Sequence, residues 1–265
     1  MKKTTLMIHS QKEKSRVPKY LFGHFLEYMY DCIDPGLWAE MLLSRGFENM
    51  DKNQSGISFP WSVVGADIEC MLDNKQFYSP GQSQKVINLN YRPGGIQQEN
   101  IKLINKQSYL GYVWTFCEKP VSFSIRILSS MNAVIFEQQY EIETGQWYKY
   151  EYEFTSEIDD NNAAIQYLIT EEGSVWFDQA SLMPLDACNG VWNDVMDLIK
   201  FLKPCILRFP GGCAADCYFW EDGIGPRDQR PSRENEHWGG VEQNQFGTDE
   251  YISLCREIGS EPLIC

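Results

Sequence analysis

Residues 191–212 read VWNDVMDLIKFLKPCILRFPGG, and this stretch decides the fold class. Pro204 ends a run whose apolar residues recur at the spacing of one helix face: Val191, Val195, Leu198 and Leu202. Residues 206–209, Ile-Leu-Arg-Phe, are a short apolar segment, which Pro210-Gly211-Gly212 ends. The stretch therefore predicts a helix followed by a buried strand.

The segments on either side extend this alternation of helices and strands. Downstream, a helix is predicted between Thr248 and Gly259, followed by an apolar strand at residues 261–265. Upstream, Tyr20–Glu27 predicts a buried strand, and the apolar residues of 37–43 return at helical spacing before Gly46. Strands that alternate with helices in this way are parallel and are joined by crossover helices.

The middle of the chain, from about Ser55 to Asp186, has a different pattern. Three runs alternate apolar and polar residues, at 121–127, 148–154 and 163–169, and turn-rich segments separate them. Period-two runs of this kind predict antiparallel strands with one face exposed to water. We therefore expect an all-β sandwich, and its length suits a jelly roll.

The predicted fold class is α/β plus all-β, with an all-β module inserted into an α/β chain. Residues 1–54 would form the first β/α unit, residues 55–186 the inserted jelly-roll β-sandwich, and residues 187–265 the continuation of the α/β part. Three parallel strands make a poor free-standing sheet, because parallel sheets bury both faces. The α/β segments are therefore expected to be the first strands of a (β/α)8 TIM barrel, truncated at Cys265.

The charge of the chain argues against nucleic acid as a partner. It holds 37 acidic and 23 basic residues, which gives a net charge of −14, and it has no Lys/Arg cluster. A neutral substrate such as a sugar fits this balance better than a polyanion. No apolar run approaches the ~20 residues of a membrane span, so no membrane partner is expected.

The N-terminus and the cysteines bear on the cellular compartment. Met1-Lys2-Lys3 resembles the start of a signal peptide, but only residues 6–8 are apolar after it, and a secretory segment needs about 7–15 such residues. Nine cysteines, an odd number without regular spacing, fit a reducing compartment. We expect a cytoplasmic protein, or a secreted or periplasmic one if the start codon is misassigned.

Several motifs of catalysis and cofactor binding do not occur in the sequence. It has no G-x-S-x-G, no G-x-x-x-x-G-K-[ST] and no H-E-x-x-H. Cys213 and Cys217 are four residues apart, and His24 lies at the end of another predicted strand, but zinc needs three or four ligands with characteristic spacing. We expect no metal and no cofactor.

Polar residues at the ends of the predicted strands are the candidate binding residues. Glu27 and Arg208 each lie at the carboxyl end of a strand, which is the active-site end in a (β/α) barrel. The long loop after the second of these strands contains Trp220 and Trp238, and loops of such length in compact domains are often functional. Aromatic rings beside a carboxylate and an arginine suit sugar binding, because the ring stacks on the sugar while its hydroxyls need polar partners.

Four segments of the chain resemble a known family. They are LFGHFLEYMYDCIDPGLW (21–38), ILRFPGG (206–212), WEDGIGPRDQRP (220–231) and NQFGTDEY (244–251). In this order they resemble the N-terminal half of the α-L-arabinofuranosidases of glycoside hydrolase family 51, over about residues 20–50 and 188–265. The middle region is similar to the carbohydrate-binding-type β-sandwich that some bacterial members insert after the first barrel strand.

The resemblance implies a function for the chain. Members of the family are retaining hydrolases on a (β/α)8 barrel, with an acid/base and a nucleophile glutamate on the fourth and seventh strands. Those strands would lie beyond Cys265, so no catalytic residue is assigned within this chain, and the chain alone is expected to be inactive. The whole enzyme would release terminal non-reducing α-L-arabinofuranosyl residues from arabinose-containing polysaccharides or oligosaccharides, and the family implies a homo-oligomer. The alternative is an inactive sugar-binding remnant that acts through the β-sandwich.

The resemblance also implies the first part of a substrate pocket. Glu27 matches a glutamate that accepts hydrogen bonds from arabinose hydroxyls, Arg208 an arginine that helps to keep the nucleophile ionised, and Trp238 an aromatic residue that lines the pocket. Cys213 stands where many relatives have a sugar-binding asparagine, and a thiol is a weaker hydrogen-bond partner. The simpler alternatives are a solvated carboxylate for Glu27, a structural ion pair for Arg208 and a core or stacking role for Trp238.

Overall fold

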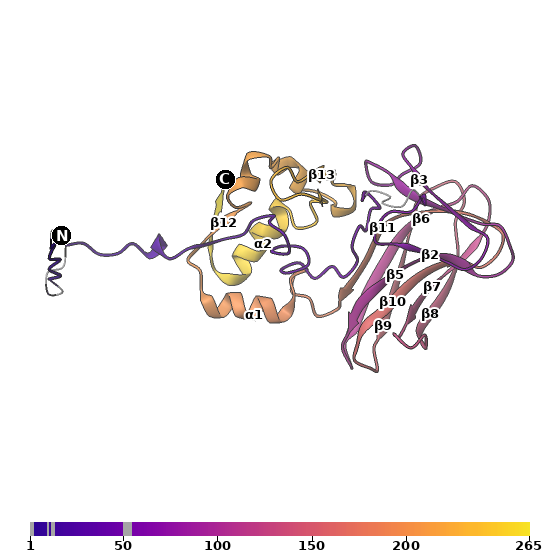
Figure 1. Ribbon diagram of the computed structural model, residues 1–265, viewed down its shortest axis with the longest axis horizontal. Helices are drawn as coiled ribbons and strands as arrows, with labels where there is room; N and C mark the ends of the chain where they lie inside the picture. The colour runs from indigo at the N-terminus through magenta and orange to yellow at the C-terminus, as the bar shows by residue number, and fades with distance from the viewer. Residues whose placement is uncertain (1–2, 10, 12–13, 50–54) are drawn as a thin grey trace.

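The computed structural model describes residues 3–9, 11, 14–49 and 55–265. The chain forms a β-sandwich and an α/β part, which lie side by side in Figure 1. The β-sandwich contains the ten strands between Ser62 and Pro184, and the α/β part contains one strand before them and the helices and strands after them. No helix of the described residues is long and apolar enough to cross a membrane.

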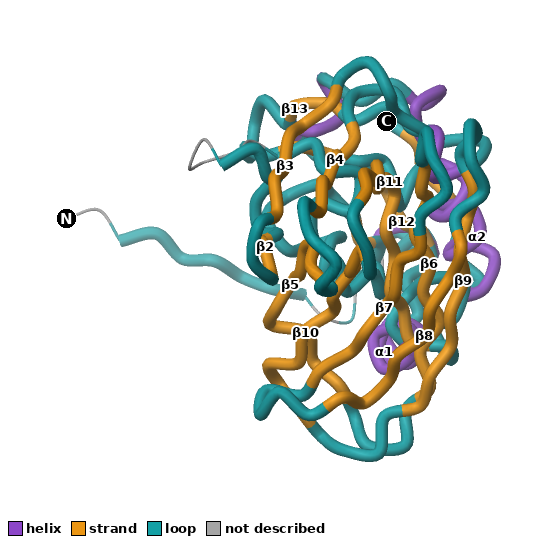
Figure 2. Tube along the Cα trace, turned by 90° about the vertical axis from the view of Figure 1, so that its right-hand side faces the viewer, coloured by secondary structure: helices purple, strands orange, loops and turns teal. Residues whose placement is uncertain are grey.

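The β-sandwich consists of two antiparallel sheets of five strands each (Figures 1 and 2). One sheet has the order β2 (Ser62–Val64), β5 (Gly94–Leu103), β10 (Asp160–Ile169), β7 (Ser122–Leu128) and β8 (Val134–Glu141). The other has the order β3 (Ile68–Asp73), β4 (Ser83–Asn88), β11 (Gly173–Pro184), β6 (Ser108–Phe116) and β9 (Tyr148–Thr155). The strands expected at 121–127, 148–154 and 163–169 are confirmed as β7, β9 and β10.

The expectation of one exposed face per strand is correct for β9 and wrong for β10. Burial alternates along β9, whereas β10 is buried on both faces from Ala163 to Ile169. β10 lies in the middle of its sheet, so that side chains of both neighbours, β5 and β7, flank its outer face. On its outer face the amide of Gln166 donates to the side chain of Gln97 at 2.9 Å, so a polar side chain is buried there with a partner.

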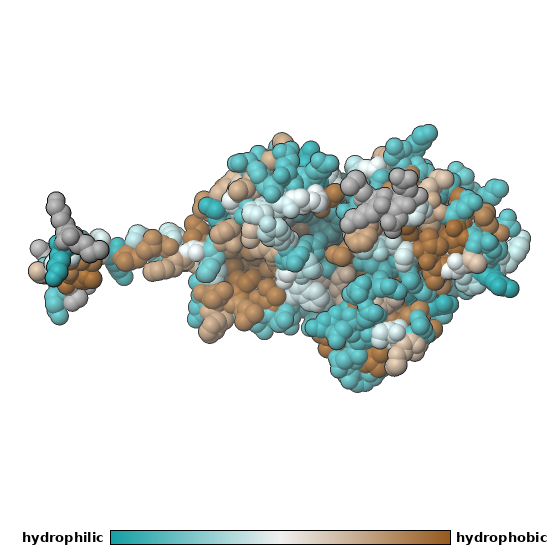
Figure 3. Space-filling view, in the orientation of Figure 1, coloured by the Kyte–Doolittle hydropathy of each residue, from teal (hydrophilic) through white to brown (hydrophobic). Residues whose placement is uncertain are grey.

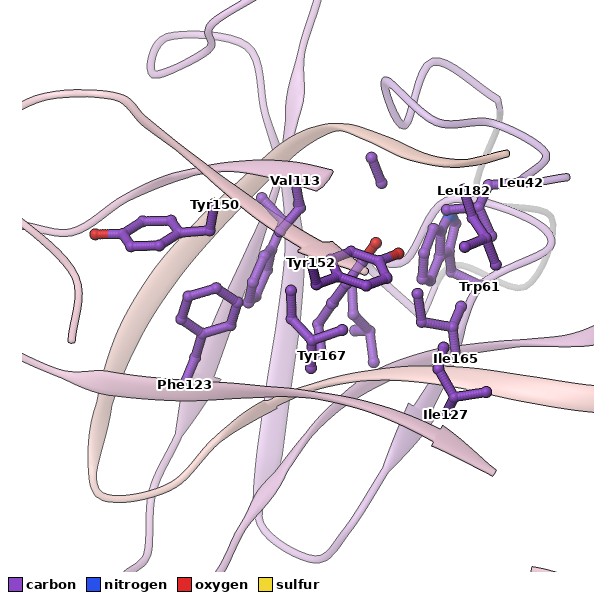
Figure 4. Packing of buried hydrophobic residues seen from close by; sticks show 14 of the residues in the cluster. Leu42, Trp61, Val113, Phe123, Ile127, Tyr150, Tyr152, Ile165, Tyr167 and Leu182 are labelled. Carbon is purple, nitrogen blue, oxygen red and sulfur yellow. The ribbon is translucent and has the colours of Figure 1, made fainter. Parts of the chain in front are cut away.

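The core between the two sheets is rich in aromatic side chains. Figure 4 shows Phe123, Tyr152 and Tyr167 pointing into the space between the sheets. The rings of Trp61 and Tyr167 stack with their centroids 5.5 Å apart. Leu42, which precedes the sandwich in the chain, is buried in the same cluster. The sandwich therefore has its own hydrophobic core, and the N-terminal segment contributes to it.

The α/β part contains three parallel strands and two helices. The strands β1 (His24–Phe25), β12 (Ile206–Phe209) and β15 (Glu261–Ile264) form a sheet with β12 in the middle, and the helices are α1 (Asn193–Leu202) and α2 (Thr248–Ile258). This confirms the parallel strands and both helices that the sequence predicts after residue 187. The first strand is shorter than the expected Tyr20–Glu27, because Lys19–Leu21 forms a single 3-10 turn.

The helix expected over residues 37–43 does not form, and this prediction is wrong. The N–H of Ala39 donates to the carbonyl of Gly190 at 2.8 Å, and the N–H of Met41 donates to the carbonyl of Leu182 at 3.0 Å. In an α-helix over residues 37–43 the N–H of Met41 would instead bond to the carbonyl of Leu37. The apolar residues of this segment are therefore buried by contacts with distant parts of the chain rather than by one helix face.

The buried side of α1 also differs from the expected one. Leu198 and Leu202 are 63% and 58% exposed, whereas Met196 is buried. Figure 3 shows apolar surface on the α/β part where α1 lies in Figure 1. In the part of the chain that the structure describes, one face of this helix remains apolar and uncovered.

Candidate substrate-binding site

The site is built at the carboxyl ends of β1 and β12. These strands are parallel neighbours, with Phe25 opposite Arg208 in the register. The N–H of Leu26 donates to the carbonyl of Arg208 at 2.8 Å, which extends the pairing by one residue beyond β1. Glu27 therefore leaves the sheet beside the loop that follows β12.

A glycine-containing turn allows this loop to approach Glu27 closely. Gly211 has φ +106°, and a Cβ atom there would lie 2.2 Å from the Cβ of Glu27. Only glycine fits this conformation and this spacing. The turn leads into the 3-10 segment Cys213–Asp216, and the N–H of Ala214 donates to Oε1 of Glu27 at 3.0 Å.

Trp238 reaches the same carboxylate from the far end of the long loop. Its Nε1–H donates to Oε1 of Glu27 at 3.3 Å. Its backbone N–H donates to the side chain of Asn235 at 3.0 Å, and Asn235 donates in turn to the carbonyl of Tyr28 at 2.9 Å. Tyr30 contacts the indole ring edge-on, with 5.0 Å between centroids. The structure thus brings Glu27 and Trp238 together although 211 positions separate them.

The environment of Glu27 favours its charged form. The residue is 4% exposed, so the alternative of a solvated carboxylate does not hold. Burial alone raises the pKa of this carboxyl group, but the N–H groups of Ala214, Trp238, Gly212 and Cys213 outweigh burial and lower the pKa below its usual value. The site therefore holds an ionised carboxylate among N–H donors.

Arg208 lies one strand away from Glu27 and does not bond to it. Its guanidinium carbon is 5.2 Å from the centre of the Phe25 ring. Its Nε is buried without a hydrogen-bond partner, and no ion pair of Arg208 occurs among the described residues. Within those residues, the alternative of a structural ion pair for Arg208 is not supported.

Cys213 has an exposed thiol at the start of the 3-10 segment, and its backbone rather than its side chain faces Glu27. Sγ of Cys217 lies 3.8 Å from Nε2 of His237 and 3.7 Å from a carboxylate oxygen of Glu236. Over the described ranges of the chain, no group of three or more His, Cys, Asp or Glu side chains is arranged to hold a metal ion.

The sequence analysis missed a buried network that holds the long loop against the β-sandwich. Oδ1 of Asp228 accepts hydrogen bonds from Arg45 at 2.6 Å and from Tyr112 at 2.7 Å, and Oδ2 accepts one from Trp114 at 3.0 Å. These donors lower the pKa of Asp228 against the effect of burial. The segment WEDGIGPRDQRP carries this aspartate, but its partners lie more than a hundred residues away.

A second arginine of the same segment fixes the other end of the loop. Arg230 is buried and donates to both carboxylate oxygens of Glu250, at 2.6 and 3.0 Å. It also donates to the carbonyl groups of Gly225 and Asn244. The loop is thus tied to the first turn of α2 and to the sandwich before it reaches Trp238.

Beside Tyr28 and Tyr30 lies a cleft of about 260 Å³ that is lined by two partly buried acids, Asp34 and Glu242. Burial and the nearby charge of Glu40 raise the pKa of Asp34 to about 7. Burial and the charge of Asp34 raise the pKa of Glu242 to about 8. The sequence analysis did not identify either acid, because the neighbouring sequence does not indicate that either one is shielded from water.

Comparisons with known proteins give a consistent result. Residues 198–265 match the family model described as the alpha-L-arabinofuranosidase 1 domain. The chain is 25% identical over 284 residues to alpha-L-arabinofuranosidase 1 of Arabidopsis thaliana, which covers 98% of this chain and 42% of that protein. It is 44% identical over 93 residues to an intracellular exo-alpha-L-arabinofuranosidase of Bacteroides ovatus, which covers 35% of this chain and 18% of that protein.

The fold agrees with these sequence matches. The structure of an arabinose-bound GH51 α-L-arabinofuranosidase superposes with a TM-score of 0.83 at 20% identity, over 94% of this chain and 44% of that one. The chain thus spans less than half the length of the relatives that it matches from end to end. Residues 198–265 thus match an arabinofuranosidase family model, the whole chain is similar to part of the length of proteins named alpha-L-arabinofuranosidases, and its fold is that of part of a GH51 α-L-arabinofuranosidase.

Proposed function

We propose that the chain is the substrate-binding front part of a retaining, exo-acting α-L-arabinofuranosidase. The observation that carries this proposal is the buried, ionised Glu27, held at the ends of two parallel strands beside Trp238. An ionised carboxylate that is fixed by N–H donors is a strong acceptor for sugar hydroxyls. The chain covers 42% of the Arabidopsis thaliana relative, so catalysis by the whole protein is part of the proposal.

In this proposal each residue of the site has a separate role. Glu27 accepts hydrogen bonds from hydroxyls of the terminal arabinofuranosyl residue, and Trp238 offers part of its ring to the sugar. Arg208 has a buried N–H without a partner, which suits a residue that sits beside a second carboxylate of the complete site. Cys213 lines the pocket with an exposed thiol and contributes a weak contact at most.

We also propose that the α/β part belongs to a (β/α)8 barrel, with residues 1–54 and 187–265 on either side of the inserted sandwich at 55–186. Two observations support this. The strand residues Phe25, Leu263 and Ile264 are 44–51% exposed, although parallel sheets normally bury both faces. The apolar residues on the outer side of α1 are exposed as well.

The chemistry of the whole enzyme would be a double displacement. A nucleophilic carboxylate and an acid/base carboxyl group lie about 5–5.5 Å apart in retaining glycosidases, on opposite sides of the scissile bond. Both glutamates are proposed to lie outside this chain. Glu221 is exposed and Asp222 pairs with Arg233, so neither is arranged for this role.

The proposed partner is an arabinose-containing oligosaccharide or polysaccharide, and the proposed compartment is the cytoplasm. The net charge of −14 suits a neutral glycan. The Bacteroides ovatus relative is named an intracellular exo-alpha-L-arabinofuranosidase.

The test uses the complete protein with Glu27→Gln and an aryl α-L-arabinofuranoside. The amide keeps the shape of the side chain but loses the charge-assisted acceptor, which is worth about 1.5–3 kcal/mol, so kcat/KM should fall roughly ten- to a hundredfold. The exposed Glu221→Gln is the matched control and should leave kcat/KM unchanged. An equal kcat/KM in both variants would remove Glu27 from the pocket.

An activity assay of the 265-residue chain alone provides a second test of the proposal. The chain should hydrolyse none of the aryl arabinofuranoside between about pH 4 and 8, because retaining catalysis needs both carboxyl groups. Turnover by this chain that disappears in Glu27→Gln or Glu221→Gln would place a catalytic carboxylate within it. A complete protein that binds arabinan and hydrolyses nothing would favour the sugar-binding remnant instead.

A further inference from the structure

A second cleft lies between the β-sandwich and α2. Its volume is about 420 Å³, and it shares no lining residue with the Glu27 site. The sandwich provides one wall with Leu110 and Met183, and α2 provides another with Asp249 and Ser253. Trp38 and Arg227, from other segments, complete the cleft. The cleft is therefore formed jointly by both parts of the chain.

Arg227 is held in this cleft with hydrogen-bonding capacity to spare. Its guanidinium carbon lies 5.1 Å from the centre of the Trp38 ring, and Nη2 donates to the hydroxyl of Tyr112 at 3.4 Å. Its Nε is buried and has no hydrogen-bond partner, and no carboxylate of the described residues forms an ion pair with it. Among the described residues the terminal nitrogens make only this long bond to Tyr112, so the guanidinium keeps N–H groups that can donate to a ligand in the cleft.

The other charges around the cleft argue against an anionic ligand. Glu250 is engaged by Arg230 at 2.6 Å, and Asp249 lies 3.8 Å from the same arginine while it accepts the N–H of Gly225. These two carboxylates would repel an anion, as would the net charge of −14. A hydroxyl group can both accept from a terminal N–H of the Arg227 guanidinium and donate to a carboxylate oxygen of Asp249.

The apolar walls complete the chemistry that a sugar needs. Leu110 is 41% exposed in β6, and Met183 lies on the neighbouring strand β11, opposite Leu110 in the register. Such a surface can contact the C–H groups of a sugar ring while its hydroxyls meet polar side chains. Charged and apolar groups are thus placed on different sides of the same cleft.

We propose that this cleft is a second sugar site, which binds a neutral pentosyl residue of the glycan through Arg227 and Asp249. The choice of a pentosyl glycan rests on the proposed function, whereas the site itself rests on the cleft and its arginine. A glycan held there would be anchored to both parts of the chain, so the inserted sandwich would contribute to substrate binding through its junction with α2.

Titration of the 265-residue chain with 1,5-α-L-arabinotriose and with xylotriose, followed by NMR or calorimetry, tests the proposal. Arg227→Gln should weaken binding of at least one of these neutral probes tenfold or more. Ser253→Tyr, which fills the cleft from α2 without touching Arg227, should do the same. Arg233→Gln is the matched control, because this exposed arginine pairs with Asp222 outside the cleft, and it should leave the affinity unchanged.

Four results would overturn the proposal. The first two are binding that survives both cleft variants and binding that is lost in Glu27→Gln alone. The other two are binding of trigalacturonate that equals or exceeds that of the neutral probes, and no binding of either neutral probe to the unmodified chain. The proposed function is tested separately by turnover of the complete enzyme, so that either idea can fail alone.

Discussion

At the scale of single residues, hydrogen-bond donors decide whether the pKa of a carboxyl group is raised or lowered when it is removed from water. Glu27 is nearly inaccessible, yet its N–H donors lower its pKa. Asp34 lies in the neighbouring cleft, and its Oδ1 is buried without a partner, so that burial raises its pKa to about 7. The same loop region thus holds one acid that stays charged and a pair that resists ionisation.

The Asp34–Glu242 pair predicts a stability that declines as the pH rises. Both folded pKa values, about 7 and about 8, lie above those of the unfolded chain, so the protonated forms stabilise the fold. This contribution is present below the unfolded pKa values and is lost as the pH rises through 7 to 8. Asp31, Glu40 and Arg45 also act on Asp34 and set the size of the effect.

Glu242→Gln should flatten this decline, because an amide stays neutral at every pH. We expect the variant to be more stable than the unmodified chain above about pH 8, by on the order of 2 kcal/mol. Urea unfolding at several pH values measures this, with Glu234→Gln, an exposed neighbour in the strand β13 (Arg233–Glu234), as the control. If the free energy of unfolding changed with pH in the same way for Glu242→Gln and the unmodified chain, the pair would ionise in the folded protein without loss of stability, which would contradict the prediction.

At the scale of elements, the long loop after β12 is held in place by contacts with other parts of the chain. Asp228 ties it to the sandwich strand β6, and Arg230 ties it to the first turn of α2. Between Arg230 and Trp238 the loop forms only the two-residue strand β13. The sandwich therefore helps to position Trp238 beside Glu27.

Asp228→Ala should destabilise the chain through Arg45. The side chain of Arg45 is 1% exposed and would lose its carboxylate partner at 2.6 Å. Removal of one member of a buried pair costs about 3–5 kcal/mol, and we expect the lower end, because Glu40 stays 3.8 Å from Arg45. Glu137→Ala breaks the more exposed pair with Arg126 and should cost less than about 1 kcal/mol. Equal losses in chemical denaturation would contradict this.

Elements with a regular period could be predicted from the sequence, and contacts between distant segments could not. The strand Ile206–Phe209, the helix from Thr248 and three sandwich strands follow from local spacing. Residues 37–43 show helical spacing too, but the N–H groups of Ala39 and Met41 bond to residues more than a hundred positions away. Tertiary hydrogen bonds overrode the local signal there.

The candidate site was predictable only in part, for the same reason. Glu27 and Arg208 could be placed because strand ends are visible in the sequence, and Trp238 because its segment resembles a family. Asp228 and Arg227 carry no local sign that one joins a buried network and the other faces a cleft. Their surroundings come from β6, α2 and the N-terminal segment, which only the folded chain brings together.

At the scale of the whole molecule, the two parts of the chain differ in how completely they are covered. The sandwich encloses a continuous aromatic core between two five-stranded sheets (Figure 4). The smaller core of the α/β part is built around Phe209, which stacks on Tyr251 at 4.9 Å, while the sheet keeps exposed apolar residues. Antiparallel strands that pair locally can fold without further strands, whereas a parallel sheet needs cover on both faces.

This difference predicts the outcome of limited proteolysis of the 265-residue chain. Proteases cut where the backbone opens locally, and opening is easiest where few apolar contacts are buried. We expect a resistant fragment that covers residues 55–186, with early cuts in the exposed N-terminal segment and after β12, as mass spectrometry of the fragments would show. Asp228→Ala should hasten the cuts after β12 and leave the sandwich fragment intact, because it frees the loop without opening the sandwich core. A resistant fragment over residues 190–265 with the middle digested would instead show that the α/β part is the autonomous unit, and the proposed division of the chain would fail.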